Sequence, residues 1–483
     1  MPASGQSDIS PLDMPPEAFR TLGHRIVDLM SEWLTGESAN PVLEPCNGEA
    51  LAQWLGGPLP REAGDVETVL EEFRERIAHY SRRNGHPRYF AYVSASADPV
   101  GILADALASA LNQNVTTWRS APAAATVERQ VLRWLDEWVG FNAGGQGLLL
   151  GGGSAANLHA IGAAMQAALD RREGNVREEL TLYVSREGHL SMTKAARFLG
   201  FAPEHVRRIA VDAERRMDPG ALDTAIREDL DRGLTPAAVC ASAGTANAGT
   251  IDPLAAIADV CERHDVWLHV DGAYGAPAAT TSRYAWLKPQ FARADSLSLD
   301  PHKWLYAPLD VGCLLVRDSA RLRAAYAQTS EYIAVQETGD IEGHAFFDHG
   351  LELSRRFRAL KLWFMFKIHG TDRIAEAIAD NIETRQYFDA RVAEHADLEL
   401  LGSDLSISCF RFAARGLNPE QTNTLNRRIL DALLADGGTV LSPTVLEGRF
   451  CLRICIVNFR TRKEDMDWLI TEVRRLGGEL ASA

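Results

Sequence analysis

Lysine is scarce in this chain. Only six of its 50 Lys and Arg residues are lysines, at positions 194, 288, 303, 361, 367 and 463. Acidic residues outnumber basic ones and leave a formal net charge of −15 on 483 residues. That balance disfavours nucleic acid or an anionic membrane as the main partner. It leaves room for an anionic ligand, because a local site can be positive within an acidic protein.

Long apolar runs are also missing, so no membrane-spanning segment is expected. The first thirty residues lack a basic start followed by an apolar run, and no secretory signal is predicted. The seven cysteines are scattered and odd in number. Cys451 and Cys455 have no histidines nearby, so a zinc site is disfavoured and no metal is expected. Buried free thiols in a reducing cytoplasm are the favoured interpretation.

Three common phosphate-binding or hydrolase motifs are absent. The chain has no GxxxxGK[ST] and no GxGxxG, and the G-x-S-x-G pattern fails at Ala156. The stretch "GGGSAAN" at 151–157 nevertheless opens a predicted helix, where glycines and first-turn N–H groups favour an anion. A phosphate that belongs to neither ATP nor NAD is therefore expected there.

The pattern of apolar and polar residues along the chain predicts three regions. Residues 1–85 show apolar residues at helical spacing and form a helical arm, expected to pack on a partner subunit. Residues 86–370 alternate short apolar runs with helical stretches, which predicts an α/β domain with a mostly parallel sheet covered by helices on both faces. Residues 371–483 predict a smaller α/β domain.

Polar groups stand at the ends of four predicted strands, where open parallel sheets bind ligands. These groups lie in 151–157, 242–250, 271–274 and 300–304. Asp271 ends the apolar strand "WLHVD", and a carboxylate there needs a cationic or donor partner. A helix cap is the simpler alternative for a lone Asp. His189, just before a helix, could lie flat on an aromatic ring.

Lys303 follows the strand "SLSL" in the sequence "DPHKW". Most lysines are solvated, but this one lies between a strand and a turn, next to Trp304. Partial desolvation near other positive charge is expected to lower its pKa, so that the neutral amine can attack a carbonyl. Lys194 is the rival amine, but it falls within a predicted helix. An anion cradle, an acid for a ring nitrogen, an imine-forming lysine and a stacking ring together indicate pyridoxal phosphate.

These motifs, in this order, resemble the group II pyridoxal-phosphate-dependent amino acid decarboxylases. The branch with aromatic-L-amino-acid, tyrosine, tryptophan and histidine decarboxylases is the most similar. The resemblance is carried by "HPRYFAY", "GGGSAANL", "EGHLSMTKAARFLG", "AGTANAGTIDPL", "WLHVDGAYG", "DPHKW" and "LRICIVNFRTRKEDMDWL". It implies fold type I and a homodimer with active sites at the interface.

The resemblance also implies roles for particular residues. Lys303 matches the Schiff-base lysine, Asp271 the pyridinium partner, His189 the stacking histidine and Tyr332 a loop tyrosine that protonates Cα. Further cofactor contacts fall at Gly153, Ser154, Thr245, Ala246, Asp300 and His302, and the substrate pocket at Tyr92, Ser94, Trp118 and Ser354. Ala246 stands where many relatives have threonine. Asp300 stands where animal enzymes have asparagine, which is unfavourable near phosphate unless it points away or pairs.

The expected reaction is decarboxylation of an L-amino acid to the amine and CO2. Tyrosine, DOPA and histidine are plausible substrates, tryptophan and phenylalanine stay open, and an acidic amino acid is disfavoured because no pocket arginine is evident. The cluster Arg355, Arg356 and Arg358 is expected on a solvated or ion-paired helix face. Two alternatives stay open: an aromatic aldehyde synthase on the same scaffold, and a non-catalytic α/β binding protein.

Overall fold

The structure is a computed structural model that describes residues 10, 12–171, 174, 176–328 and 342–482. The helices are α1 (Pro16–Thr35), α2 (Gly48–Leu55), α3 (Val66–Glu72), α4 (Pro99–Leu111), α5 (Pro122–Val139), α6 (Gly153–Asp170), α7 (Leu190–Phe198), α8 (Pro219–Asp231), α9 (Leu254–His264), α10 (Lys288–Phe291), α11 (Ser319–Tyr326), α12 (Ala359–Ala393), α13 (Pro419–Asp436) and α14 (Lys463–Ser482). The strands are β1 (Gly147–Leu150), β2 (Leu180–Ser185), β3 (Val206–Ile209), β4 (Thr235–Ser242), β5 (Trp267–Asp271), β6 (Ser296–Leu299), β7 (Gly312–Val316), β8 (Leu398–Asp404), β9 (Ile407–Phe412), β10 (Ser442–Leu446) and β11 (Arg449–Cys455).

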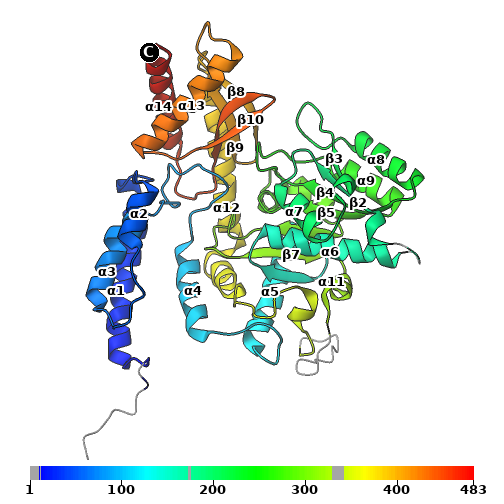
Figure 1. The fold of residues 1–483 in the computed structure, drawn as a ribbon, viewed down its shortest axis with the longest axis horizontal. Coiled ribbons are helices and arrows are strands. Elements are labelled where there is room, and N and C mark those ends of the chain that lie inside the picture. The colour runs from blue at the N-terminus through cyan, green and yellow to red at the C-terminus, as the bar shows by residue number, and fades with distance from the viewer. Residues whose placement is uncertain (1–9, 11, 172–173, 175, 329–341, 483) are drawn as a thin grey trace, which may run out of the picture.

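A seven-stranded sheet forms the centre of the molecule, in the order β1-β7-β6-β5-β4-β2-β3 (Figure 1). Strands β3, β2, β4, β5 and β6 are parallel, and only β7 runs against its neighbours β6 and β1. These strands consist of small and apolar residues that are buried on both sides, as a sheet covered by helices requires. The predicted α/β class with a mostly parallel sheet is confirmed.

One edge of this sheet collects the carboxyl ends of four strands. Strand β1 is antiparallel to β7, which is antiparallel to β6, so β1 points the same way as β4, β5 and β6. Helix α6 follows β1 at this edge and packs across β4, β5, β6 and β7. The segments that the sequence singled out after these strands are thereby brought together.

A second, antiparallel sheet of order β10-β11-β9-β8 lies near the carboxyl end of the chain with α13 and α14 (Figure 1). Its side chains form a separate apolar cluster that includes Phe388, Phe410 and Ile429. The long helix α12 crosses from the large sheet to this cluster and is interrupted at Gly370, where φ is 75° and ψ is 159°. The boundary expected at 370/371 coincides with this interruption and stays a prediction.

The amino-terminal helices α1, α2 and α3 contain no buried residue among those described. Figure 1 shows them as a rod alongside the rest of the molecule. The exposed side chains Phe19, Val27, Trp54, Val69 and Phe73 leave apolar surface on this arm.

Within the described residues, no helix is long and apolar enough to cross a membrane. All seven cysteines are free. Six are buried as expected, but Cys46 is exposed because it lies in the coil before α2.

Candidate active site

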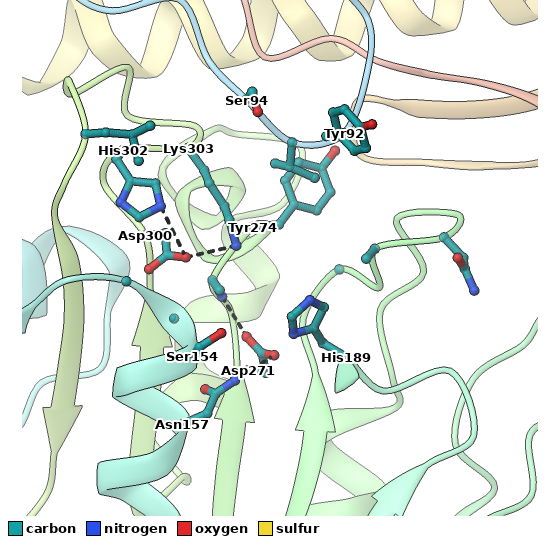
Figure 2. Close-up of a pocket in the computed structure, with 18 of the residues that line it drawn as sticks. Tyr92, Ser94, Ser154, Asn157, His189, Asp271, Tyr274, Asp300, His302 and Lys303 are labelled. Atoms are coloured by element: carbon teal, nitrogen blue, oxygen red, sulfur yellow. Dashed lines mark hydrogen bonds and ion pairs between the residues drawn. The ribbon is translucent and has the colours of Figure 1, made fainter. Parts of the chain in front are cut away.

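A cavity of 840 Å³ opens at the sheet edge where β1, β4, β5 and β6 end (Figure 2). Ten of the residues predicted to form the site line it: Tyr92, Ser94, Gly153, Ser154, His189, Ala246, Asp271, Asp300, His302 and Lys303. Described residues from six segments that are far apart in the chain therefore meet at one place. The chemistry of the cavity follows from how each side chain is held.

The anion cradle is built by the start of α6. Gly152 occupies the N-cap position with φ of 154° and has no side chain to offer as a cap. A Cβ atom added to Gly153 would lie 2.8 Å from Oδ2 of Asp300 and 2.9 Å from Cβ of Ala273. Only glycine leaves this space open, so backbone N–H groups at the positive end of the helix can reach an anion.

Asp271 ends β5 and is held by donors on both carboxylate oxygens. Its Oδ1 accepts from the backbone N–H of Ala273 at 3.0 Å and from the hydroxyl of Ser298 at 3.1 Å. Its Oδ2 accepts from the side-chain amide of Asn157 at 3.2 Å. Asp271 is 7% exposed and lines the cavity, so its carboxylate can contact a ligand bound there.

His189 caps α7 and forms one wall of the cavity. Its Nδ1 accepts from the backbone N–H of Ser191 at 3.3 Å and lies 2.8 Å from the hydroxyl of the same residue. Burial lowers the pKa of this imidazole, although Asp271 opposes the effect. A neutral ring is therefore favoured, and its face is available for stacking on an aromatic ligand.

Lys303 follows β6 and points into the cavity, with its side chain 25% exposed (Figure 2). Its Nζ lies 2.9 Å from Oδ2 of Asp300, and Nε2 of His302 lies 3.7 Å from the same oxygen. Burial lowers the pKa of Lys303, but the carboxylates of Asp300 and Asp271 outweigh it and hold that pKa above its ordinary value. The lowered pKa expected from the sequence is wrong, because the neighbouring charges are negative.

The residues present fit pyridoxal phosphate. The cradle accepts a phosphate, Lys303 provides an amine, Asp271 an acid and His189 a ring. The second carboxylate oxygen of Asp300, Oδ1, is buried and has no hydrogen-bond partner among the described residues. The site therefore contains a polar atom that the protein leaves without a partner. Asp300 does not point away from the cradle but pairs with Lys303. Pairing is one of the two arrangements in which an acid near the phosphate was expected to be tolerated.

Three predicted site residues that the structure describes, Thr245, Trp118 and Ser354, are not part of the cavity lining. Thr245 is buried, and its Oγ1 accepts from the N–H of Thr250 at 3.1 Å, so it shapes the turn after β4. Trp118 and Ser354 lie outside the cavity lining. Tyr332 falls within 329–341, outside the described residues. The roles given to these residues stay predictions.

The cavity lining includes residues that the sequence did not assign to the site, among them Arg453 and Asn157. Arg453 lies on β11, is buried, and donates to the backbone carbonyls of Asn247 and Tyr92. The expectation that the pocket holds no arginine is wrong, because the strand that brings Arg453 comes from the small domain. Asn157 ends the quoted motif "GGGSAAN" and faces Asp271 from one turn into α6. Its place in that motif was the available signal.

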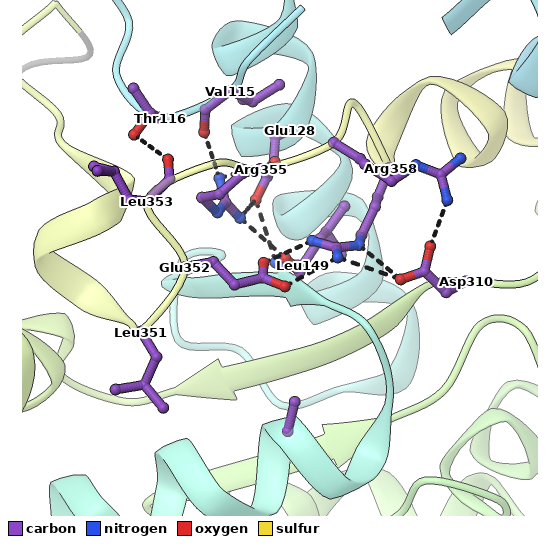
Figure 3. A network of polar contacts seen from close by, with 12 residues as sticks. Val115, Thr116, Glu128, Leu149, Asp310, Leu351, Glu352, Leu353, Arg355 and Arg358 are labelled. Atoms are coloured by element: carbon purple, nitrogen blue, oxygen red, sulfur yellow. Dashed lines mark hydrogen bonds and ion pairs between the residues drawn. The ribbon is translucent and has the colours of Figure 1, made fainter. Parts of the chain in front are cut away.

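All three arginines before α12 are ion-paired, as predicted, but they precede the helix and therefore form no helix face (Figure 3). Arg355 is buried and pairs with Glu128, Nη2 to Oε1 at 2.5 Å, while also donating to the carbonyls of Val115 and Leu149. Arg358 is buried against Glu352 and Asp310, and only Arg356 is exposed. The cluster precedes the helix, and Arg355 ties the chain to the end of β1 instead of facing water.

A lysine, an acid and a phosphate cradle at the carboxyl edge of a mostly parallel sheet define the class of fold type I pyridoxal-phosphate enzymes. Residues 50–413 match the family described as "Pyridoxal-dependent decarboxylase conserved domain". The chain belongs to this family, and pyridoxal phosphate is its cofactor. The family resemblance read from the motifs is confirmed.

Individual relatives match over nearly their whole length. Aromatic-L-amino-acid decarboxylase of Bacillus atrophaeus is 35% identical over 473 residues, which cover 97% of this chain and 98% of that protein. Phenylacetaldehyde synthase of Petunia hybrida is 29% identical over 91% of this chain and 90% of its own. The solved structure of Oryza sativa TDC with PLP and tryptamine superposes with a TM-score of 0.92 and 29% identity, covering 98% of this chain and 99% of that one.

Proposed function

We propose that this protein is a pyridoxal-phosphate-dependent decarboxylase that converts an aromatic L-amino acid to its amine and CO2. The observation that carries the proposal is the placement of Lys303 in the same cavity as Asp271, beside an open glycine cradle. Membership of the decarboxylase family and the names of the relatives support the reaction and the aromatic substrate class.

Each cavity residue has a task in this proposal. The first-turn amides at Gly153 and Ser154, with His302, would hold the phosphate. Lys303 would hold the cofactor through its amine, for which its ammonium must first lose a proton. When bound, pyridoxal phosphate supplies an electron-poor ring that accepts the electron pair left by departing CO2.

Two residues would maintain that ring in its reactive state. The Asp271 carboxylate would keep a proton on the ring nitrogen, since a fixed negative charge stabilises the positive form. The neutral imidazole of His189 would lie against the ring face. Contacts from Ala246 and Asp300 would complete the cofactor pocket.

Protonation of the substrate Cα is assigned to Tyr332, with His189 as a second donor. The assignment of Tyr332 rests on its sequence position alone. The role of Tyr332 also decides between amine formation and the second candidate function, an aldehyde synthase. That function is supported by the similarity to phenylacetaldehyde synthase of Petunia hybrida and 4-hydroxyphenylacetaldehyde synthase of Rhodiola rosea. Such relatives usually lack the loop tyrosine, so its presence favours amine formation.

The substrate side of the cavity is proposed to be lined by Tyr92 and Ser94, with Trp118 and Ser354 completing it in the assembled enzyme. Aromatic walls suit a flat side chain. The guanidinium of Arg453 adds positive charge to the cavity wall. Because every amino acid carries a carboxylate, this charge by itself does not favour an acidic side chain.

The assembly proposed is a homodimer, in which the arm of residues 1–85 packs on a second copy of the chain. Its support is the apolar surface of α1, α2 and α3, in which none of the described residues is fully buried. The remaining units proposed are the cofactor-binding domain at 86–370 and the small domain at 371–483. The free thiols support a reducing, cytoplasmic location.

The test uses the purified full-length protein. We expect a visible absorption band that borohydride bleaches and that Lys303→Ala lacks. A panel of the twenty amino acids scored for CO2 release should single out aromatic ones. Quantifying amine against aldehyde and peroxide separates the two candidate functions. A colourless protein with no borohydride-fixed cofactor would instead identify a non-catalytic binding protein.

A further inference from the structure

A chain of hydrogen bonds runs beneath the cavity from β5 to both Asp271 and His189. Indole Nε1 of Trp267 donates to Oγ of Ser296 at 2.8 Å, and that oxygen lies 2.9 Å from Nδ1 of His269. Nε2 of His269 lies 3.0 Å from Oδ1 of Asn157. His269, Ser296 and Asn157 are at most 1% exposed, so water cannot substitute for these partners.

The two ends of this chain fix the direction of every bond in it. An indole N–H can only donate, and a carboxylate can only accept. At the far end, Asn157 must therefore turn its NH2 group to Asp271, which leaves its Oδ1 facing His269. His269 must then donate from Nε2 and accept at Nδ1 from the Ser296 hydroxyl. The Asp271 end requires a proton on Nε2 of His269, and the Trp267 end is compatible with this because Ser296 can accept from the indole and donate to Nδ1. Burial lowers the pKa of this imidazole despite the opposing charge of Asp271, which favours the neutral ring.

Asn157 divides the chain into two branches. Its Nδ2 lies 3.2 Å from Oδ2 of Asp271 and 2.9 Å from Oγ of Ser191, so each of its two hydrogens has an acceptor. Because Ser191 Oγ accepts from Asn157, its own hydrogen is free to donate to Nδ1 of His189 at 2.8 Å. Nδ1 of His189 also accepts from the backbone N–H of Ser191 at 3.3 Å, so both contacts place the proton of the neutral ring on Nε2. One amide group thus contacts both Asp271 and the hydroxyl that hydrogen-bonds to His189.

We propose that His269 is a positioning residue that acts through Asn157. By donating to the amide oxygen, it holds the Asn157 NH2 group toward Asp271 and Ser191, and so fixes the Asp271 carboxylate that the cofactor meets and supports the Ser191 hydroxyl that contacts His189. This inference rests on the proposed function, in which Asp271 holds the ring nitrogen. The residues that carry it lie on α6, β5 and β6, outside the substrate side of the cavity.

The first test compares two replacements at position 269 in the full-length enzyme. His269→Met removes the donor to Asn157, whereas His269→Gln places an amide N–H at a similar reach. Leaving a buried group unsatisfied costs about 1–3 kcal/mol, so the Met variant should bind pyridoxal phosphate about tenfold more weakly. The Gln variant should stay within about threefold of the wild-type dissociation constant.

The second readout is the pH midpoint at which the visible band of the bound cofactor changes. The charged and titratable groups facing Asp271 are Lys303, His189 and His269 itself, with the Cys240 thiol behind it. The midpoint should move in His269→Met and return in His269→Gln. Ser296→Ala should move the pH midpoint in the same direction by a smaller amount. This variant replaces His269→Met in the measurement if the Met variant does not fold.

A matched control is His159→Met. His159 is a second buried histidine, two residues after Asn157 on the same helix, and it does not line the cavity. It should lower thermal stability without moving the midpoint. An unchanged midpoint and affinity in His269→Met, or a Gln variant as impaired as Met, would overturn the inference. Asp271→Asn distinguishes a failure of this inference from a failure of the proposed function. If Asp271→Asn also changes neither the cofactor affinity nor the pH midpoint, the proposed function fails.

Discussion

The amino group of Lys303 forms an ion pair with Asp300, Nζ to Oδ2 at 2.9 Å, three residues earlier in the chain. The carboxylate is 1% exposed and lies against the glycine cradle, where the phosphate of the cofactor is proposed to bind. The same acid therefore holds the lysine in its charged form and borders the anion site. Cofactor capture must separate this pair.

Asp300→Asn should move cofactor capture to lower pH. The neutral amine reacts, and Asp300 raises the pKa of Lys303, so losing the carboxylate lowers that pKa and makes the neutral form available at lower pH. The rate at which the visible band grows after pyridoxal phosphate is added to apoenzyme, measured across pH, checks this. Asp105→Asn, which removes the partner of the buried Lys361, should leave the profile in place.

Gly153→Ala should weaken cofactor binding. The added Cβ would approach Asp300 Oδ2 to 2.8 Å and Ala273 Cβ to 2.9 Å, and overpacking of this kind costs about 1–3 kcal/mol. Equilibrium titration of apoenzyme with pyridoxal phosphate should show a dissociation constant about tenfold higher or more. Gly478→Ala, whose Cβ meets nothing within 4 Å, is the control. Equal affinities in the two variants would contradict the cradle.

Arg355→Met should destabilise the fold more than Arg356→Met. Arg355 and Glu128 are 2% and 0% exposed, and removing one partner of a buried pair costs about 3–5 kcal/mol. Arg356 is 56% exposed, and its pair with Asp310 is worth at most about 1 kcal/mol. Urea unfolding at one fixed protein concentration measures both. Similar losses in the two variants would argue against the buried network.

Val69→Glu should disrupt the proposed dimer. Val69 is 56% exposed on α3, among the apolar side chains that a second copy would cover, and burying an unpaired carboxylate there is unfavourable. Light scattering after size exclusion should show a shift toward monomer. Val445→Glu is a matched control, since this valine is 53% exposed on the small domain, away from the arm. Dissociation by both variants, or by neither, would count against the arm as the interface.

Much of the site was predictable because its chemistry follows strand ends. Lys303, Asp271 and the glycines of 151–153 each come directly after a short apolar run, and parallel strands deliver their carboxyl ends to one edge. The sign of the Lys303 pKa shift was not predictable. It depends on which side of the lysine the Asp300 carboxylate lies, and that is a matter of side-chain packing in the turn.

The sequence by itself determined the cofactor and the mostly parallel sheet, because each depends on residue type and local order along the chain. Only the tertiary structure decided which partners those groups have. Arg453 enters the cavity from the small domain, Arg355 is buried against Glu128, and Asn157 joins His269 to Asp271. These contacts join residues between 112 and 361 positions apart, and no local pattern encodes a distance in space between such residues.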